Sequence, residues 1–234
     1  MKVDILASGS GGNCIAVSSD STTILIDAGI AKTKIEKRLL EAGIRPDEIA
    51  GIFITHSHAD HIKGLPLAAK YHIPIYASEG TWKMIGPADV KDGLISEGHG
   101  VYFVNDGVHV NAFQTHHDDY ESYGFTVWNA ESKVSICLDT GHIDRVMLAA
   151  MADSDIYIIE ANHDPDLMAA SDYPDSVKAR ILSDIGHLSN QQAAEALAKL
   201  VQGRGERIYL THLSKSNNRH EIARATVETA LRRR

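Results

Sequence analysis

The sequence predicts an α/β protein in which two mixed β-sheets pack face to face and carry helices on their outer sides. Short apolar segments of strand length alternate with helical segments along the whole chain. Several of the strand candidates are continuous apolar runs, which are typical of strands buried on both faces. Hairpin turns such as Asn105-Asp106-Gly107 also occur, and they argue against a purely parallel sheet.

The first half of the chain is rich in short strands. A helix is predicted over 32–42, where Ile35, Leu39 and Leu40 recur at helical spacing. Gly43 follows this helix as a stop signal. The strands predicted in this half are 3–7, 14–18, 23–26, 51–55, 74–76, 101–104 and 108–115.

The second half repeats the mixture of strands and helices. Ser189 and Gln192 have the spacing of a capping box in front of an Ala- and Leu-rich helix. Asn218, three residues before Glu221, predicts the start of another helix. The strands predicted in this half are 124–129, 133–138, 156–160 and 207–210.

The composition is that of an ordinary globular protein. Its 234 residues include 18 glycines and 6 prolines, which excludes collagen-like and disordered chains. We find no long linker or repeat, so we expect one domain over 1–234 with a substantial core. The 31 acidic residues outnumber the 23 basic ones, which argues against a protein that coats duplex DNA without specificity. A phosphodiester held mainly by metal ions remains compatible with this charge.

The two cysteines and the N-terminus predict a cytoplasmic protein. Cys14 and Cys137 lie far apart and form no Cys-x-x-Cys pair, so we expect two reduced thiols. The chain begins without the hydrophobic segment of a signal peptide. No uncharged apolar run approaches the ~20 residues that a membrane-spanning helix needs, and we expect no membrane association.

Thirteen histidines stand out in this composition, because imidazole is the commonest metal ligand in proteins. Four candidate ligands follow an apolar strand directly, in His56-Ser57-His58-Ala59-Asp60-His61. In an extended stretch His56 and His58 project to the same side. A turn into a helix brings Asp60 and His61 to a neighbouring point. The segment therefore predicts two ligands for each of two metal ions.

This segment resembles the His-x-His-x-Asp-His signature of the metallo-β-lactamase-fold hydrolases. The resemblance implies a four-layer αβ/βα sandwich, with a dinuclear metal site at one edge that is built from loops at the strand ends. It also implies three more ligands downstream. One ion would be held by His56, His58 and His117, the other by Asp60, His61 and His212, with Asp139 as the bridge between them.

The doublet His116-His117 leaves two candidates for one ligand position. We prefer His117, because the family pattern reads His-Asp followed shortly by Gly-Phe, as in His117-Asp118 and Gly124-Phe125. Alternation along a strand puts only one of the two histidines on a given face, so His116 is expected at the surface.

Four further segments narrow the resemblance to the YycJ/WalJ-type group, whose members are associated with DNA exonuclease activity. These segments are 8–14, 160–164, 186–190 and 212–218, and the resemblance spans nearly the whole chain. It is thinnest at about 78–101, where no motif can be placed. The group resemblance implies a metal-dependent phosphodiester hydrolase that acts on nucleic acid, with DNA favoured and no obligate protein partner evident.

Further residues are expected to act around the metals. Asp60 is expected to serve as ligand and proton acceptor, and His187 or His163 to protonate the departing oxygen. Either histidine could instead be a loop residue bonded to backbone. The Ser/Gly loop can present N–H groups to a phosphate, or can simply be a tight turn. The residues expected to bind substrate are Ser8, Ser10, Gly11, Asn13, Lys178, Arg180, Ser214, Asn217 and Asn218.

Nitrogen and carboxylate ligands without thiolates suit two divalent ions, Zn²⁺ or Mn²⁺, and accommodate Ni²⁺ as well. Two such ions lower the pKa of a shared water from ~15.7 towards ~7, and the resulting hydroxide attacks phosphorus. An alternative is a small-molecule hydrolase of the same fold, similar to lactonases or thioesterases. A non-catalytic metal-binding module is the third hypothesis, and the seven candidate ligands count against it.

Overall fold

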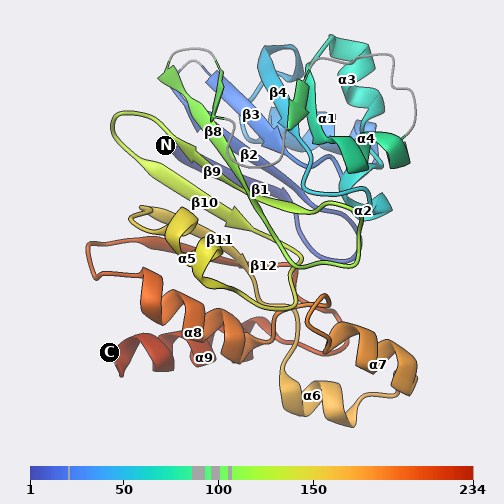
Figure 1. The fold of residues 1–234 in the computed structure, drawn as a ribbon. Coiled ribbons are helices and arrows are strands. Elements are labelled where there is room, and N and C mark those ends of the chain that lie inside the picture. The colour runs from blue at the N-terminus through green and yellow to red at the C-terminus, as the bar shows by residue number, and fades with distance from the viewer. Residues whose placement is uncertain (21, 86–92, 96–100, 105–106, 234) are drawn as a thin grey trace.

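The computed structural model of the protein describes residues 1–20, 22–85, 93–95, 101–104 and 107–233. Figure 1 shows four layers, in which helices cover the outer faces of two stacked sheets. The predicted four-layer αβ/βα sandwich is therefore confirmed. Among the described residues, no helix has both the length and the apolar composition needed to cross a membrane.

The first sheet has the strand order β1-β2-β3-β4-β5-β6. Its first three strands pair antiparallel, and β3 to β6 pair parallel. Each of the predicted strands in this region is present, with ends that differ by at most two residues. The strands are β1 (Lys2–Ala7), β2 (Cys14–Ser19), β3 (Thr22–Ile26), β4 (Ile49–Phe53), β5 (Ile75–Ser78) and β6 (Gly93–Ile95).

The second sheet has the order β12-β11-β10-β9-β8-β7. Here β7 to β10 pair antiparallel, whereas β10 to β12 pair parallel. Both sheets are therefore mixed, as the sequence predicts. The strands are β7 (Val101–Phe103), β8 (His109–Gln114), β9 (Tyr123–Trp128), β10 (Lys133–Cys137), β11 (Ile156–Glu160) and β12 (Arg207–Thr211).

Helices flank both sheets or follow the strands that reach the site. On the side of the first sheet lie α1 (Lys32–Glu41), the 3₁₀ helix η1 (Pro46–Glu48), α2 (Ala59–Ile62), α3 (Pro66–Tyr71) and α4 (Glu79–Ile85). The second half of the chain forms α5 (Arg145–Met151), α6 (Pro165–Ala170), α7 (Asp175–Ile181), α8 (Asn190–Leu200) and α9 (His220–Arg232).

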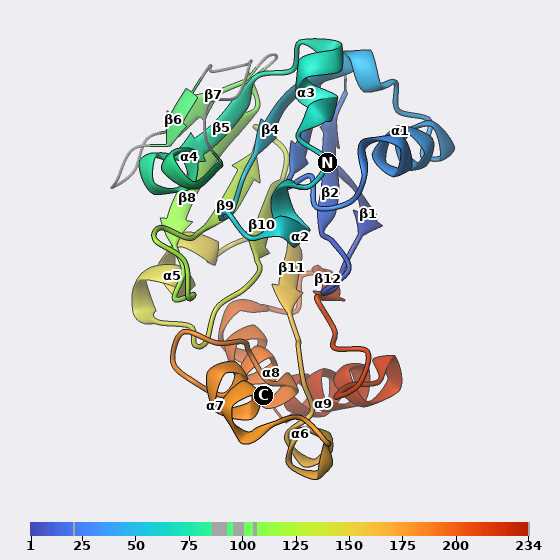
Figure 2. The same ribbon diagram turned by 90° about the vertical axis from the view of Figure 1, so that its right-hand side faces the viewer.

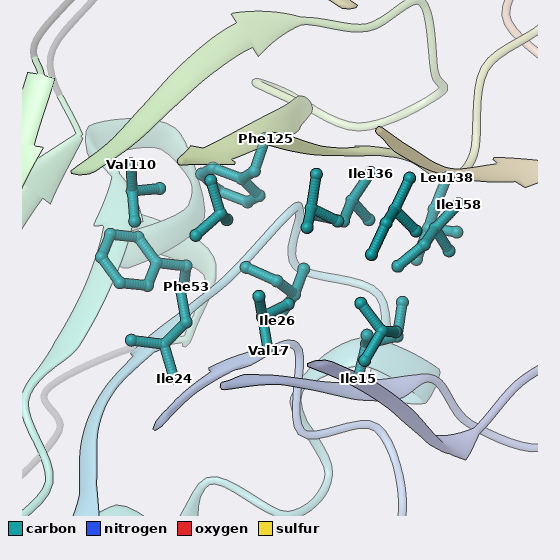
Figure 3. Packing of buried hydrophobic residues seen from close by; sticks show 14 of the residues in the cluster. Ile15, Val17, Ile24, Ile26, Phe53, Val110, Phe125, Ile136, Leu138 and Ile158 are labelled. Atoms are coloured by element: carbon teal, nitrogen blue, oxygen red, sulfur yellow. The ribbon is translucent and has the colours of Figure 1, made fainter. Parts of the chain in front are cut away.

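The central core lies between the two sheets (Figure 3). Ile26 and Phe53 of the first sheet face Phe125 and Ile136 of the second, and all four are fully buried. Separate apolar clusters hold α1 and α3 on one sheet, and α5 and α8 on the other. Burial on both faces explains why the sequence of these strands reads as continuous apolar runs.

One unpredicted strand and three local predictions need comment. β6 was not predicted, because it lies in the segment without motifs. Asn218 is not the cap of α9, which begins after Arg219 without a side-chain cap. The Asn218 side chain bonds instead to Asn190 and to the carbonyl of Ala161, so it is not available to the helix.

The predicted capping box at Ser189 is confirmed. Of the predicted turn 105–107, residues 105–106 lie outside the described part of the chain.

Candidate metal centre and active site

The turn that carries the histidine motif is anchored to the loops after β1 and β3. Asn13 N donates to the carbonyl of Asp60, and Ala28 N to the carbonyl of His61, both at 2.8 Å. A Cβ on Gly29 would lie 1.6 Å from the carbonyl oxygen of Asp60. Only glycine allows this close approach. These contacts fix α2 at the end of β4, and with it the candidate ligands.

The first ligand cluster contains His56, His58 and His117, which follow the ends of β4 and β8. His56 Nε2 lies 3.0 Å from His58 Nδ1, and His117 Nε2 lies 3.3 Å from the same atom. The Nδ1 atoms of two rings are already engaged, with Thr55 Oγ1 for His56 and with the carbonyl of Gly186 for His117. Their Nε2 atoms are therefore the ones that can bind a metal ion.

The second cluster contains Asp60, His61 and His212. The Nε2 atoms of His61 and His212 lie 3.7 and 3.8 Å from Asp60 Oδ2. Asp139 connects the two clusters, because its Oδ2 lies 2.7 Å from His61 Nε2 and 3.6 Å from His56 Nε2. The seven predicted metal ligands thus come together at one edge of the sandwich, with Asp139 between the two groups.

Two observations indicate that these residues fit divalent ions. His212 Nε2 is buried and has no hydrogen-bond partner, which costs ~1–3 kcal/mol unless something binds it. Asp27, Asp139 and His212 all have positive φ, at 61°, 41° and 54°. Non-glycine residues rarely adopt this conformation, and such strain collects at functional sites. The backbone is therefore bent to direct these side chains at one point.

The buried carboxylate of Asp27 orients the His61 ring through its Nδ1 atom. Asp27 Oδ2 lies 2.7 Å from His61 Nδ1 and accepts a hydrogen bond from Thr55 Oγ1 at 2.9 Å. Burial alone lowers the pKa of His61, but the charges of Asp27 and Asp139 outweigh it and raise that pKa to about 10. The bond between Asp27 and Thr55 N also ends β4 at Phe53, earlier than predicted. Asp27 therefore orients the candidate ligand His61.

Glu160 belongs to this site, although no role for it is predicted from the sequence. It is fully buried at the end of β11, and its Oε1 lies 2.7 Å from both His187 Nδ1 and His212 Nδ1. Its Oε2 accepts a hydrogen bond from Leu188 N at 3.1 Å. Burial opposes charge on Glu160, but His187 and His212 outweigh it and lower the pKa of the carboxyl. The signal in the sequence was an acidic residue that ends an otherwise apolar strand.

The ligand clusters open into a cavity of about 290 Å³. Its lining includes six candidate site residues, His58, Asp60, His117, Asp139, His187 and His212. The remaining lining residues are Ser10, Asn162, Tyr173, Val177, Arg180, Ile181 and Ser214. Of the residues predicted to bind substrate, this cavity therefore contains Ser10, Arg180 and Ser214.

Two predicted site residues have other surroundings. His163 is only 1% exposed and does not line the cavity, so it cannot touch a substrate in this structure. Its carbonyl accepts a hydrogen bond from Asn190 N, which ties it to the start of α8. Lys178 Nζ donates to the carbonyl of Ala169, outside the cavity. Neither position supports the role expected from the sequence.

Most of the other predicted substrate-binding residues support the loops. Asn13 Oδ1 accepts from Gly9 N, and its Nδ2 lies 3.0 Å from His61 Nε2. Ser8 Oγ accepts from His212 N, and Asn218 is buried in the bonds described above. Asn217 is also buried, while Gly11 is exposed on the turn. Ser8 and Asn218 line a neighbouring cavity of about 520 Å³, together with Lys215 and Arg219.

The structure separates the two histidines of the doublet. His117 joins the first ligand cluster, whereas His116 Nε2 lies 3.0 Å from Asp144 Oδ2. The His116 ring stacks on His142, with ring centroids 3.9 Å apart. His116 is thus directed away from the metal ligands.

The sequence matches a known family over most of its length. The model of the beta-lactamase superfamily domain covers residues 22–213, so the chain belongs to this superfamily. Within it, the chain falls in the YycJ/WalJ group. It is 37% identical to Exodeoxyribonuclease YycJ of Bacillus anthracis, over 97% of this chain and 88% of that protein. It is 36% identical to Exodeoxyribonuclease WalJ of Streptococcus pneumoniae, over 98% of this chain and 88% of that protein.

Solved structures share the fold at lower sequence identity. The metallo-beta-lactamase fold protein YhfI of Bacillus subtilis superposes with a TM-score of 0.74 at 17% identity, covering 97% of this chain and 91% of that one. Zn²⁺-bound PqqB of Methylobacterium extorquens gives a TM-score of 0.73 at 18% identity, covering 97% and 95%. Family membership implies divalent-metal binding, for which the clusters above are the candidate sites.

Proposed function

We propose that this chain is a metal-dependent phosphodiesterase that removes nucleotides from DNA ends. The observation that carries the proposal is the cavity, in which the ligand clusters, His187 and the Arg180 guanidinium line one small space. The two relatives named as exodeoxyribonucleases, 36–37% identical over nearly the whole chain, support the same activity. Because ligands come from both sheets, we also propose that residues 1–234 act as one domain.

We propose two divalent ions, Zn²⁺ or Mn²⁺, with Ni²⁺ also accommodated by the ligand types. When bound, such ions supply Lewis acidity and lower the pKa of water. His56, His58 and His117 would hold one ion and Asp60, His61 and His212 the other, with Asp139 between them. Four Nδ1 atoms bonded to protein groups fix the ring orientations, so little rearrangement is needed for binding.

We propose that His187 donates a proton to the departing oxygen. Burial alone lowers the pKa of His187, but Glu160 and Asp139 outweigh it and raise that pKa to about 10. The side chain is 15% exposed and lines the cavity, so a protonated ring can reach a substrate. Glu160 holds this ring in position. Asp60, 30% exposed at the cavity wall, accepts the proton released from the attacking water.

The scissile phosphate would meet positive charge in a protein that is acidic overall. Arg180 lines the cavity and is paired with Asp118, which follows the ligand His117. Ser10 and Ser214 add hydroxyl groups to the lining of the same cavity. Substrate binding should therefore depend on metal and on Arg180 more than on a broad basic surface. The two free, buried cysteines support action in the reducing cytoplasm.

The test is nucleotide release from end-labelled single- and double-stranded DNA by metal-free protein reloaded with Zn²⁺, Mn²⁺ or Ni²⁺. We expect mononucleotides from one end, and no release after chelation. An RNA of the same sequence and a panel of lactones and thioesters are assayed beside it. Turnover of acyl substrates without metal-dependent nucleotide release would overturn the proposal.

A further inference from the structure

The cavity has an apolar wall that the proposed chemistry does not use. Tyr173, Val177 and Ile181 line it, and the last two lie on α7, four residues apart and therefore on the same helix face. Figure 2 shows α6 and α7 outside the stacked sheets, beyond the ends of β11 and β12. The metal ligands and this wall thus enclose one space, although they belong to different parts of the fold.

These side chains are not part of a hydrophobic core. No residue of α7 is buried, and Val177 remains 38% exposed. In the part of the chain that the structure describes, Tyr173 makes no hydrogen bond and no ring contact. Protein packing therefore does not explain an aromatic and two aliphatic side chains around the opening of a metal site.

The lining of the cavity combines two kinds of side chain that together fit one nucleotide. The ligand clusters and Arg180 suit a phosphate, whereas Tyr173 offers a flat apolar surface. Base–aromatic stacking tolerates any sequence, because every base has a π-face. At about 290 Å³ the cavity is at the lower end of ligand pockets, so it suits one terminal unit better than a continuous duplex.

We propose that Tyr173, supported by Val177 and Ile181, binds the terminal nucleobase and so places the first phosphodiester at the metal ligands. This inference rests on the proposed function, because it names how that site holds its substrate. Tyr173 is a positioning and specificity residue, while the bond cleavage itself belongs to the metal ligands and His187. The enzyme would therefore require a base at the strand end without reading its identity.

The test compares two oligonucleotides that differ only at the end that is cleaved. One carries a normal terminal nucleotide, and the other an abasic analogue with the same sugar and phosphate. We expect the wild-type protein to favour the normal end by about tenfold in kcat/KM, since stacking is lost in the abasic one. Tyr173→Ala should lower kcat/KM for the normal end by a similar factor and abolish the preference, whereas Tyr173→Phe should retain both.

Leu182→Ala provides a matched control, because Leu182 is exposed at the end of the same helix and does not line the cavity. It should leave the preference intact. Equal cleavage of both ends by the wild-type protein would overturn the role of Tyr173 and leave the nuclease function standing. Metal-dependent release from neither end would overturn the proposed function itself. The wild-type comparison remains decisive even if Tyr173→Ala fails to fold.

Discussion

The two walls of the cavity differ in how firmly the protein holds them. The metal-ligand wall follows strand ends, and its residues His117, Asp139 and His212 are at most 7% exposed. The α7 wall has no buried residue and contributes to no hydrophobic core cluster. The difference follows from the chemistry, because metal ligands need fixed geometry while a surface that accepts different bases does not. Changes in the first wall should affect catalysis, and changes in the second mainly substrate binding.

The largest effect is expected from Asp60→Ala. This substitution removes a ligand from the second cluster and the acceptor for the proton of water, so nucleotide release should fall by at least ~10³-fold. Because Asp60 is 30% exposed, the fold should survive. Single-turnover assays and metal analysis measure the loss. Wild-type nucleotide release by this variant would show that Asp60 is neither a required metal ligand nor the proton acceptor.

A smaller effect is expected from Glu160→Gln, which keeps the shape of the side chain and removes its charge. Activity or metal affinity should fall by ~10–100-fold, since Glu160 holds both His187 and His212. The carboxylate helps to raise the pKa of His187, so its loss lowers that pKa. The ring then loses its proton at lower pH, and the alkaline limb of the pH–rate profile should move to lower pH. An unchanged limb would exclude His187 as the acid.

Arg180→Ala tests the contribution of the α7 wall to substrate binding. We expect KM for an oligonucleotide to rise by about tenfold with little change in kcat, because one charge-assisted contact to phosphate is lost. The guanidinium is largely exposed, so the loss of its pair with Asp118 should change the free energy of unfolding by no more than ~1 kcal/mol. Lys178→Ala is the matched control, since Lys178 lies outside the cavity. Equal effects of both substitutions would indicate non-specific charge attraction.

The smallest effect concerns stability. Val177→Ala on α7 should change the free energy of unfolding by no more than about 0.5 kcal/mol, as expected for an exposed position. Ile158→Ala in the core between the sheets should cost ~2–5 kcal/mol. Denaturant titration of both variants measures the contrast. A large loss from Val177→Ala would show that α7 is part of the cooperative core.

The sequence alone predicted the architecture and the side chains that form the candidate metal clusters. Apolar runs predicted every described strand except β6, because burial on two faces leaves a continuous pattern that needs no tertiary information. The motif from His56 to His61 lies within six consecutive residues, so metal binding could be predicted from the sequence as well.

Only the tertiary structure decided which neighbours these residues meet. Glu160 became part of the site because β11 ends beside the loops of His187 and His212, which lie 27 and 52 residues further along the chain. The same folding buried His163, a residue that the sequence presented as a catalytic candidate. Tyr173, which precedes α7, lines the same cavity as the metal ligands, and no local pattern in the sequence indicates this proximity. Local patterns encode burial, whereas contacts between distant segments depend on how the two sheets stack.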